Sequence, residues 1–250
     1  MIRVCVAGRT GWAGSAVAAG VEAARDLELV AGVSRTGEGD YRSVAEALDA
    51  APADVVVDFT HAAVAKEHAS VALERGVAVV IGSSGLGADD YDALERLAVE
   101  HGVAVVAAGN FSLTAALLLR FATVAAGRFA TWEVIDYANA TKPDAPSGTA
   151  RELAERLGEV RAPSLGVPVV DVLGAREARG AAVAGTQVHS LRLPSFVVST
   201  EIVFAGAGER LSLRHDAANT PAPYVAGTLL AIRATEGRVG LTRGLDRLLG

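Results

Sequence analysis

Short apolar runs alternate with amphipathic stretches along the first 110 residues. The runs are IRVCVAG, LELVAGVS, DVVVDFT, VAVVIGSS and VAVVAAG, and segments with helical periodicity at 12–25, 43–50, 62–75 and 88–101 lie between them. Continuous β-branched runs of this length are typical of strands that are buried on both faces of a parallel sheet. The first part of the chain therefore predicts an α/β fold with an N-terminal Rossmann-type parallel sheet.

The pattern changes after Asn110. A long helical pattern at 112–129 leads to one strand at 131–139, a polar loop and a helix at 147–160. Three further runs, VHSLRLPS, FVVSTEIVFAG and ERLSLRHDA, follow with the spacing of hairpins, and residues 221–237 form an apolar helical pattern. We expect a second, α+β domain at 110–217, and a first domain made of 1–109 plus 218–250.

Composition limits the classes of partner. The chain has 250 residues, 51% of them hydrophobic, and a net charge of −6. No concentrated Lys/Arg patch is present, which argues against a surface for nucleic acid or anionic membrane. The single cysteine, Cys5, lies in an apolar run and predicts a buried thiol. No His/Cys/carboxylate cluster has metal-ligand spacing, and no signal peptide or long apolar segment opens the chain, so we expect a cytoplasmic protein without a metal.

The first chemical motif is VAGRTGWAG, in which Gly8, Gly11 and Gly14 lie between a strand and a helix. Glycines in this place let the backbone turn tightly and approach a pyrophosphate, whose charge then lies at a helix N-terminus. A plain Gly-rich turn is the alternative, but the strand–helix alternation that follows favours a dinucleotide site. The predicted cofactor contacts in this loop are Gly8, Arg9, Thr10, Gly11, Trp12, Ala13 and Gly14.

The end of the second strand indicates which dinucleotide is preferred. An NAD site usually has an acid there, against the ribose 2′-hydroxyl. This chain has Ser34 and Arg35, whose hydroxyl and guanidinium suit a 2′-phosphate. With help from Arg9, we expect a preference for NADPH, with NADH as the second choice. The alternative is that Arg35 projects into solvent.

Several motifs together resemble the dihydrodipicolinate reductase family of the lysine pathway. VVVDFT, IGSSG, AAGNFS and KPDAPSGTA occur in the family's order and spacing, and the tail RGAAVAGTQVHSLRL … GERLSLRHDA is also similar. The resemblance implies a dinucleotide-binding domain completed by the C-terminal helix, and a substrate-binding domain whose open mixed sheet assembles a homotetramer, or a dimer. Further cofactor contacts are expected at Phe59, Thr60, Gly82, Ser83, Ser84, Gly109, Asn110 and Phe111.

The resemblance also implies a carboxylate site in the loop YANATKPDAPSGTA. Lys142, Ser147, Gly148 and Thr149 correspond to the lysine and the S-G-T turn that hold a substrate carboxylate in the family. The chemistry is reasonable, because the start of a helix offers N–H donors to an anion and Lys142 offers a counter-charge. An ordinary helix cap with a solvated lysine is the alternative.

One departure from the family concerns the proton donor. The family pattern E-x-H-H-x-x-K-x-D reads DYANATKPD here, so Ala138 and Asn139 replace the paired histidines. General acid catalysis contributes about 10²–10⁴ in rate. The candidates for catalysis are Lys142, Asn139 and Tyr137, although strand alternation turns Tyr137 to the face opposite Ala138. Alternatively, the imine arrives already protonated and needs no acid.

These observations predict an NADPH-preferring reductase that transfers hydride to a small cyclic, carboxylated imine or conjugated imine. Two alternatives stay open. The first is a divergent imine reductase that acts outside the lysine pathway. The second is a catalytically silent NADPH-binding protein, which Ala138 alone supports.

Overall fold

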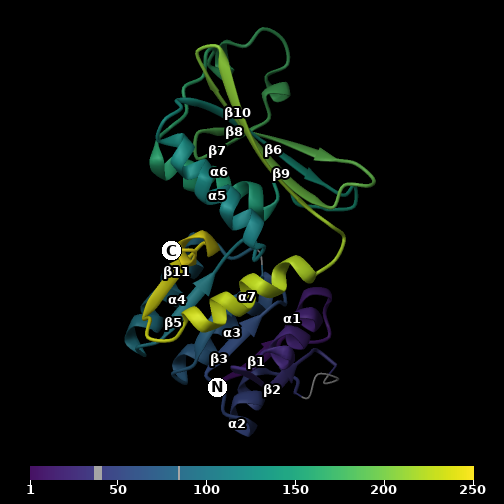
Figure 1. Cartoon of the computed structure of the whole chain (residues 1–250), viewed down its shortest axis with the longest axis vertical. Coiled ribbons are helices and arrows are strands. Elements are labelled where there is room, and N and C mark those ends of the chain that lie inside the picture. Colours follow the sequence, from purple (N-terminus) through teal and green to yellow (C-terminus); the bar gives the residue numbers. More distant parts are fainter. Residues whose placement is uncertain (37–40, 84) are drawn as a thin grey trace. The chain divides into compact units, whose positions relative to one another are not determined.

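The computed structural model describes residues 1–36, 41–83 and 85–250, and the chain divides into two compact units (Figure 1). Unit 1 comprises Met1–Leu113 and Pro221–Gly250, and unit 2 comprises Thr114–Thr220. The sequence pattern predicted domain boundaries at 109 and 217.

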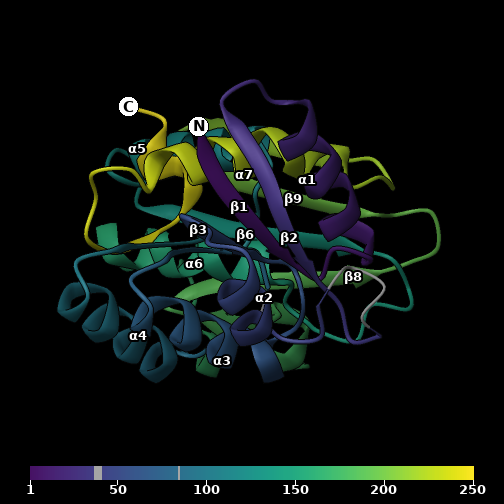
Figure 2. The ribbon, with the colours of Figure 1, turned by 90° about the horizontal axis from the view of Figure 1, so that it is seen from below.

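Unit 1 is built on a parallel sheet of six strands in the order β11-β5-β4-β3-β1-β2. Helices α1 and α7 cover one face, and α2, α3 and α4 cover the other (Figure 2). This is the Rossmann-type fold that the sequence predicted. The strands are β1 (Ile2–Ala7), β2 (Leu27–Val33), β3 (Val55–Asp58), β4 (Ala78–Ile81), β5 (Ala104–Ala107) and β11 (Gly240–Arg243); the helices are α1 (Trp12–Ala23), α2 (Val44–Ala50), α3 (Ala62–Glu74), α4 (Ala88–Glu100) and α7 (Ala222–Ala234), with a short 3-10 helix η3 (Leu245–Leu248).

The core of unit 1 explains why its strands read as continuous apolar runs. β3, β4 and β5 are buried along their whole length, because helices cover both faces of the sheet. On the α3 side the contacting residues are small: Ala65, Ala69 and Ala72 recur at helical spacing and have no exposed surface. These alanines let α3 lie close to the sheet, which fixes the position of the strand ends.

Strand β11 was missed by the sequence analysis. It is a four-residue segment, GLTR, that pairs in parallel with β5 at the edge of the sheet. It is only partly buried and contains two polar residues, so it shows no apolar run. Together with α7, it makes the C-terminal segment part of unit 1.

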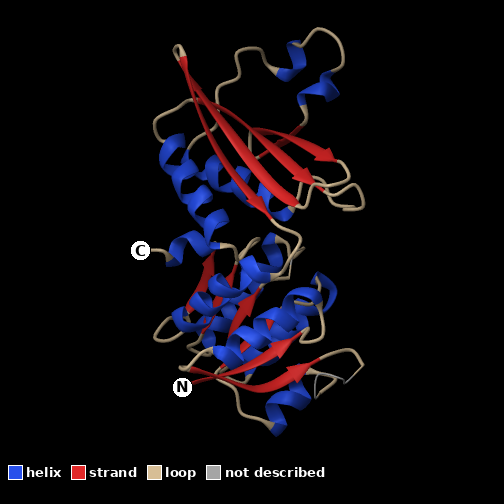
Figure 3. Ribbon diagram, turned by 45° about the vertical axis from the view of Figure 1, so that its right-hand side comes forward, coloured by secondary structure: helices blue, strands red, loops and turns tan. Residues whose placement is uncertain are grey.

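Unit 2 is a mixed five-stranded sheet in the order β10-β9-β6-β8-β7, with α5 and α6 on one face (Figure 3). Trp132, Val134, Ile202 and Phe204 point from the sheet into a core that α5 and α6 complete. The strands are β6 (Thr131–Ala138), β7 (Ala181–Val183), β8 (Thr186–Arg192), β9 (Val198–Gly206) and β10 (Glu209–Ala217); the helices are α5 (Leu113–Ala126) and α6 (Gly148–Val160), with 3-10 helices η1 (Val169–Asp171) and η2 (Arg176–Arg179).

The spacing of the last three apolar runs predicts two hairpins, β8 with β9 and β9 with β10. The second prediction is confirmed and the first is wrong. β9 and β10 form an antiparallel hairpin, as expected. β8 and β9 do not pair, because β6 lies between them, parallel to β8 and antiparallel to β9. β6 has the strictest alternation of buried side chains in unit 2, and this amphipathic strand takes the central position. The short β7, which pairs with β8, was also missed.

Candidate functional site

The glycine loop of unit 1 lies where the strand order reverses. β1 pairs with β2 on one side and β3 on the other, so the loops after β1 and β3 flank the switch point at which such sheets bind ligands. Gly8 has a φ of +84°, and a Cβ there would lie 2.6 Å from the Phe59 carbonyl oxygen. A Cβ at Gly14 would lie 2.0 Å from the Gly8 carbonyl oxygen. Both positions therefore require glycine, which keeps the loop close to α1 and to the end of β3.

The other predicted residues of the glycine loop lie around the start of α1. The Arg9 guanidinium is 3.4 Å from the Glu22 carboxylate. Trp12 is 54% exposed and packs edge-on against Tyr224, with ring centroids 5.8 Å apart. The Gly11 N–H donates to the Gly8 carbonyl over 2.8 Å, while Thr10 is exposed and Ala13 is half-buried. The loop thus offers exposed side chains beside the first turn of a helix.

The residues predicted to select the cofactor follow β2. Ser34 is buried, and its hydroxyl oxygen is 3.5 Å from that of Thr36. Arg35 is exposed at the carboxyl end of the strand. Arg35 therefore lies two residues after Val33, whose carbonyl oxygen accepts the N–H groups of Gly8 and Arg9.

The remaining predicted cofactor residues follow β3, β4 and β5. Phe59 and Phe111 pack edge-to-face at 5.7 Å, and a Cβ at Gly82 would strike the Phe59 ring at 2.3 Å. Phe111 is almost fully buried, so its side chain serves packing. The Asn110 side-chain oxygen accepts from the Ser112 N–H at 2.8 Å, just after exposed Gly109. Ser84 lies outside the described residues.

Asp58 joins two of these strand ends and was not singled out from the sequence. It is fully buried at the end of β3 and accepts hydrogen bonds from the hydroxyls of Ser83 (2.5 Å) and Thr60 (2.7 Å) and from the Thr60 N–H (3.0 Å). His68 Nδ1 of α3 lies 2.7 Å from its other oxygen. Burial raises the pKa of this carboxyl, but the hydrogen bonds from His68, Ser83 and Thr60 outweigh burial and lower it. In the sequence, Asp58 is marked by one feature, an acidic residue at the end of the apolar run VVVD.

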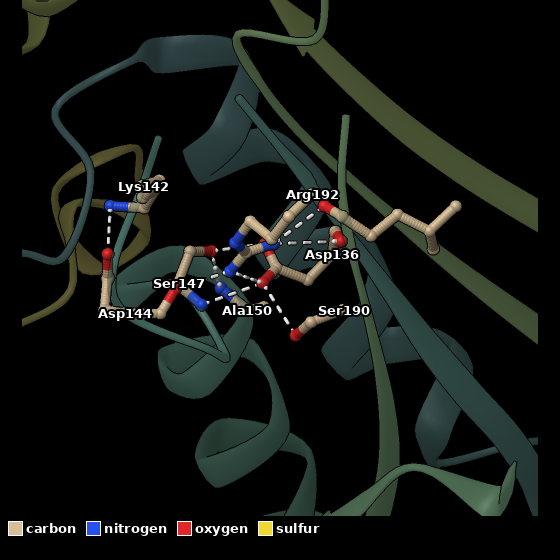
Figure 4. A network of polar contacts seen from close by, with 8 residues as sticks. Asp136, Lys142, Asp144, Ser147, Ala150, Ser190 and Arg192 are labelled. Carbon is tan, nitrogen blue, oxygen red and sulfur yellow. Dashed lines mark hydrogen bonds and ion pairs between the residues drawn. The ribbon is translucent and has the colours of Figure 1, made fainter. Parts of the chain in front are cut away.

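The loop predicted to bind a carboxylate lies at the start of α6 (Figure 4). Lys142 Nζ is 2.8 Å from the Asp144 carboxylate. Ser147 caps α6, because its hydroxyl oxygen accepts from the Ala150 N–H at 3.3 Å. Gly148 is the first residue of the helix, where N–H groups have no intrahelical acceptor, and Thr149 follows in the same turn. Lys142 and this turn therefore provide positive charge and hydrogen-bond donors in one loop.

Asp136 lies beneath this turn and was also missed. It is fully buried, and it accepts from the Ser147 N–H (2.9 Å), the Ser147 hydroxyl (2.6 Å) and the Ser190 hydroxyl (3.1 Å). Arg192 pairs with it at 2.8 Å. Burial raises the pKa of Asp136, but the hydrogen bonds from Ser147 and Arg192 lower it further than burial raises it. Both donors of Ser147 are thus directed to Asp136, and the residue organises the helix start.

The three predicted catalytic residues differ in their surroundings. The Tyr137 hydroxyl donates to Glu201 over 3.0 Å, and the Arg214 guanidinium lies 4.7 Å from its ring centroid. Burial and the Glu201 carboxylate raise the pKa of Tyr137, which makes its hydroxyl a weaker acid. Ala138 is fully buried, in line with β6 alternation. The Asn139 side-chain oxygen accepts from the N–H (3.1 Å) and hydroxyl (3.0 Å) of Thr141, so Asn139 shapes the loop.

We expect the two buried carboxylates to make the protein sensitive to acid. Their pKa values are lower in the folded chain than the usual value of about 3.9 for the unfolded one. They therefore stabilise the fold above that value, and the stabilisation is lost as the pH falls through the folded pKa. Urea unfolding between pH 7 and pH 3 should show stability falling below about pH 4. The fall should be shallower in Asp136→Asn, and an identical slope in this variant would contradict the assignment.

Over residues 1–36, 41–83 and 85–250, no group of three or more His, Cys, Asp or Glu side chains is placed to hold a metal ion. Within the same ranges, no helix has the length and apolar character needed to cross a bilayer.

The chain is similar to known proteins over nearly its whole length. Residues 2–111 match the model of the dihydrodipicolinate reductase N-terminus, and residues 112–249 match that of its C-terminus. A 4-hydroxy-tetrahydrodipicolinate reductase from Mycolicibacterium vanbaalenii is 39% identical over 249 residues, covering 99% of each chain. An enzyme of the same name from Moorella thermoacetica is 37% identical, covering 99% of this chain and 98% of its own.

A solved structure agrees over the full length. The dipicolinate-bound dihydrodipicolinate reductase from Paenisporosarcina sp. TG-14 has a TM-score of 0.84 and 29% identity, and each chain is covered completely. A putative myo-inositol dehydrogenase from Sinorhizobium meliloti, with a TM-score of 0.68 and 14% identity, shares the fold alone. The resemblance inferred from the motifs is confirmed, and the chain belongs to the dihydrodipicolinate reductase family.

Proposed function

We propose that this protein is an NAD(P)H-dependent reductase that reduces a small cyclic, carboxylated imine or its conjugated form. The observation that carries the proposal is the loop in which Lys142 and the first turn of α6 offer an ammonium and helix N–H groups to an anion. The relatives are named for 4-hydroxy-tetrahydrodipicolinate, and the Paenisporosarcina structure holds dipicolinate. We propose that the present protein also acts on a cyclic, carboxylated compound of this class.

The cofactor would be held by unit 1 and the substrate by unit 2. In unit 1, the Gly8–Gly14 loop accommodates a pyrophosphate at the start of α1, and Asp58 fixes the segments that follow β3 and β4. A bound nicotinamide supplies the hydride. In unit 2, Lys142, Gly148 and Thr149 would orient the substrate through its carboxylate.

The proton that the imine nitrogen needs is better supplied by the substrate itself than by a residue of this site. The Tyr137 hydroxyl is directed to Glu201, and an asparagine amide such as that of Asn139 does not supply a proton at neutral pH. The Lys142 ammonium is paired with the Asp144 carboxylate at 2.8 Å. We therefore propose that the imine binds already protonated, so that residues of this chain orient it and need not act as a strong acid.

We also propose a preference for NADPH over NADH, supported by Ser34 and Arg35, which stand in place of an acid directly after β2. In Arg35→Ser, the KM for NADPH should rise about tenfold or more, because a charge-assisted contact of about 1.5–3 kcal/mol is lost, while the KM for NADH should hardly change. Steady-state kinetics with both cofactors measure this. Arg75→Ser removes an exposed arginine that pairs with Asp49 instead and is the control. Equal effects on both cofactors would contradict the role of Arg35.

A second candidate function is an imine reductase with a substrate outside the lysine pathway. Ala138 favours it, because the position of a family histidine holds a methyl group that is fully buried. The two candidates share the fold and the cofactor loop. They differ in the substrate that is turned over.

The deciding experiment follows NADPH oxidation with freshly generated 4-hydroxy-tetrahydrodipicolinate and, in parallel, with the simple cyclic imine 1-pyrroline, and repeats both with NADH. Turnover of the first substrate is the expected result. Turnover of 1-pyrroline alone would favour the second candidate. Tight NADPH binding without oxidation by either would mean a catalytically silent binding protein.

We also propose that the protein self-associates as a homotetramer and that it is located in the cytoplasm. The sheet of unit 2 has helices on one face, and side chains of the other face, such as Leu191, which is 36% exposed, are open in the single chain. This open face supports the proposal that copies associate through it. Light scattering coupled to size exclusion would give the mass in solution.

A further inference from the structure

The residues beneath the start of α6 form a continuous chain of polar contacts. It runs from the Asp136 carboxylate through Arg192 and Asp144 to the Lys142 ammonium (Figure 4). Arg192 joins Asp136 to Asp144, because its Nη2 lies 2.8 Å from the Asp136 carboxylate and donates to the Asp144 carbonyl oxygen over 2.6 Å. The Asp144 carboxylate in turn pairs with Lys142 at 2.8 Å. One guanidinium therefore links a buried strand end to the loop that carries the lysine.

We propose that Arg192 and Asp136 are positioning residues for the substrate carboxylate. They act through other groups, since Asp136 holds Ser147 at the start of α6 and Arg192 holds the backbone of Asp144. This inference rests on the proposed function, which puts a carboxylate at this turn. It adds the two residues that set where the turn and Lys142 present their positive charge.

The buried charge of Asp136 needs a counter-charge if an anion binds at the start of α6. Asp136 is fully buried and lies beside the α6 N-terminus, where it accepts the N–H and the hydroxyl of Ser147. The pKa of this carboxyl is lowered, so it is charged at neutral pH. A buried negative charge would oppose an anion bound at the same helix end. Arg192, whose side chain is only 17% exposed, supplies the counter-charge that removes this opposition.

The Arg192 guanidinium also fixes the backbone of the loop that carries Lys142. Arg192 Nη1 donates to the Leu191 carbonyl oxygen at 2.9 Å, so the guanidinium is held against its own strand, β8. From this fixed base Nη2 reaches the Asp144 carbonyl of the loop. Without this bond, the backbone at Asp144 loses an anchor, and the Lys142–Asp144 pair moves with it. Lys142 would then meet the substrate carboxylate in many orientations instead of one.

The test uses the full-length protein and four variants. In Arg192→Met, we expect the Kd for dipicolinate, used as the probe, and the KM for the carboxylated imine to rise roughly 10- to 100-fold, as when a charge-assisted contact is lost. The Kd for NADPH should stay the same, and kcat should change less than KM. Arg192→Lys keeps the charge and should lose less. Asp136→Leu with Arg192→Met removes the opposing charge but also both groups that hold the loop, so its Kd for dipicolinate should stay well above that of the wild-type protein.

The control variant is Arg233→Met, which removes an arginine that pairs with Asp26 at 2.6 and 2.9 Å in unit 1. It should leave dipicolinate binding unchanged. A wild-type Kd in Arg192→Met would overturn the proposal, as would a loss of kcat with an unchanged KM. If Arg192→Met does not fold, Arg192→Lys and the double variant decide by the same measure, and wild-type Kd values in both would overturn it.

Amide hydrogen exchange at Ser147 separates this inference from the proposed function. The N–H of Ser147 is donated to Asp136, so its exchange should be faster in Arg192→Met whatever the substrate is. If the wild-type protein binds no dipicolinate, the proposed substrate class is wrong, and the exchange rate alone then decides. Faster exchange would support positioning of the loop by Arg192, and unchanged exchange would overturn it.

Discussion

The Gly14→Ala variant is expected to bind NADPH about 10- to 100-fold more weakly than the wild-type protein. The added Cβ would lie 2.0 Å from the Gly8 carbonyl oxygen and 2.7 Å from the Gly8 carbonyl carbon, which are backbone atoms and cannot rotate away. Overpacking of this kind costs about 1–3 kcal/mol, and here it displaces the loop that would approach the pyrophosphate. Fluorescence titration with NADPH measures the loss, and thermal unfolding should show a lower Tm.

Gly87→Ala is the matched control for this variant. Gly87 also precedes a helix of unit 1, but its φ is −89°, and the nearest atom to an added Cβ is an Asp90 carboxylate oxygen at 3.8 Å. Alanine fits there without a clash, so affinity and Tm should stay close to wild type. Wild-type NADPH affinity in Gly14→Ala would mean that the glycine loop does not hold the cofactor.

The Asp58→Asn variant is expected to lose about 3 kcal/mol of unfolding free energy, which corresponds to a Tm lower by roughly 6–12 °C. The carboxylate accepts hydrogen bonds from Ser83 and Thr60 and lies 2.7 Å from His68 Nδ1. An amide has the same shape but presents an NH₂ group to one set of donors, and it leaves buried polar groups unsatisfied. Urea and thermal unfolding at pH 7 provide the measurement.

Asp92→Asn is the control, since Asp92 is exposed on α4 and a substitution there should stay within about 0.5 kcal/mol. The NADPH affinity of Asp58→Asn should also fall, because Thr60 follows β3, which flanks the switch point, and Ser83 follows the neighbouring strand β4. A stability within 0.5 kcal/mol of wild type would show that the Asp58 hydrogen bonds add no net stability.

The sequence predicted the fold well where periodicity is strong. Each of the five apolar runs of the first half is a strand of the parallel sheet, because burial on both faces leaves a continuous apolar signal. The missed strands, β7 and β11, have three and four residues at sheet edges, where burial leaves little pattern. The wrong pairing of β8 with β9 has a different cause. Spacing along the chain does not show that β6 lies between them.

The sequence indicates candidate site residues where a motif is contiguous. The glycine loop is local in sequence and its residues contact one another within unit 1; the segment from Lys142 to Thr149 is likewise local, within unit 2. Asp136 and Arg192 are separated by 56 positions, and Asp58 and Ser83 by 25, so no local pattern joins them. The remaining signal is an acid at a position where strand alternation calls for an apolar residue, as at Asp136 in β6.

The return of the C-terminal segment to unit 1 affects how the chain folds during synthesis. The ribosome completes the sequence of unit 2 at Thr220, whereas unit 1 still lacks α7 and its edge strand β11 at that moment. Because domains generally fold as units as they emerge, unit 2 is the first to have its whole sequence available. Until β11 arrives, β5 is an exposed edge of the parallel sheet, open to pairing with other nascent chains.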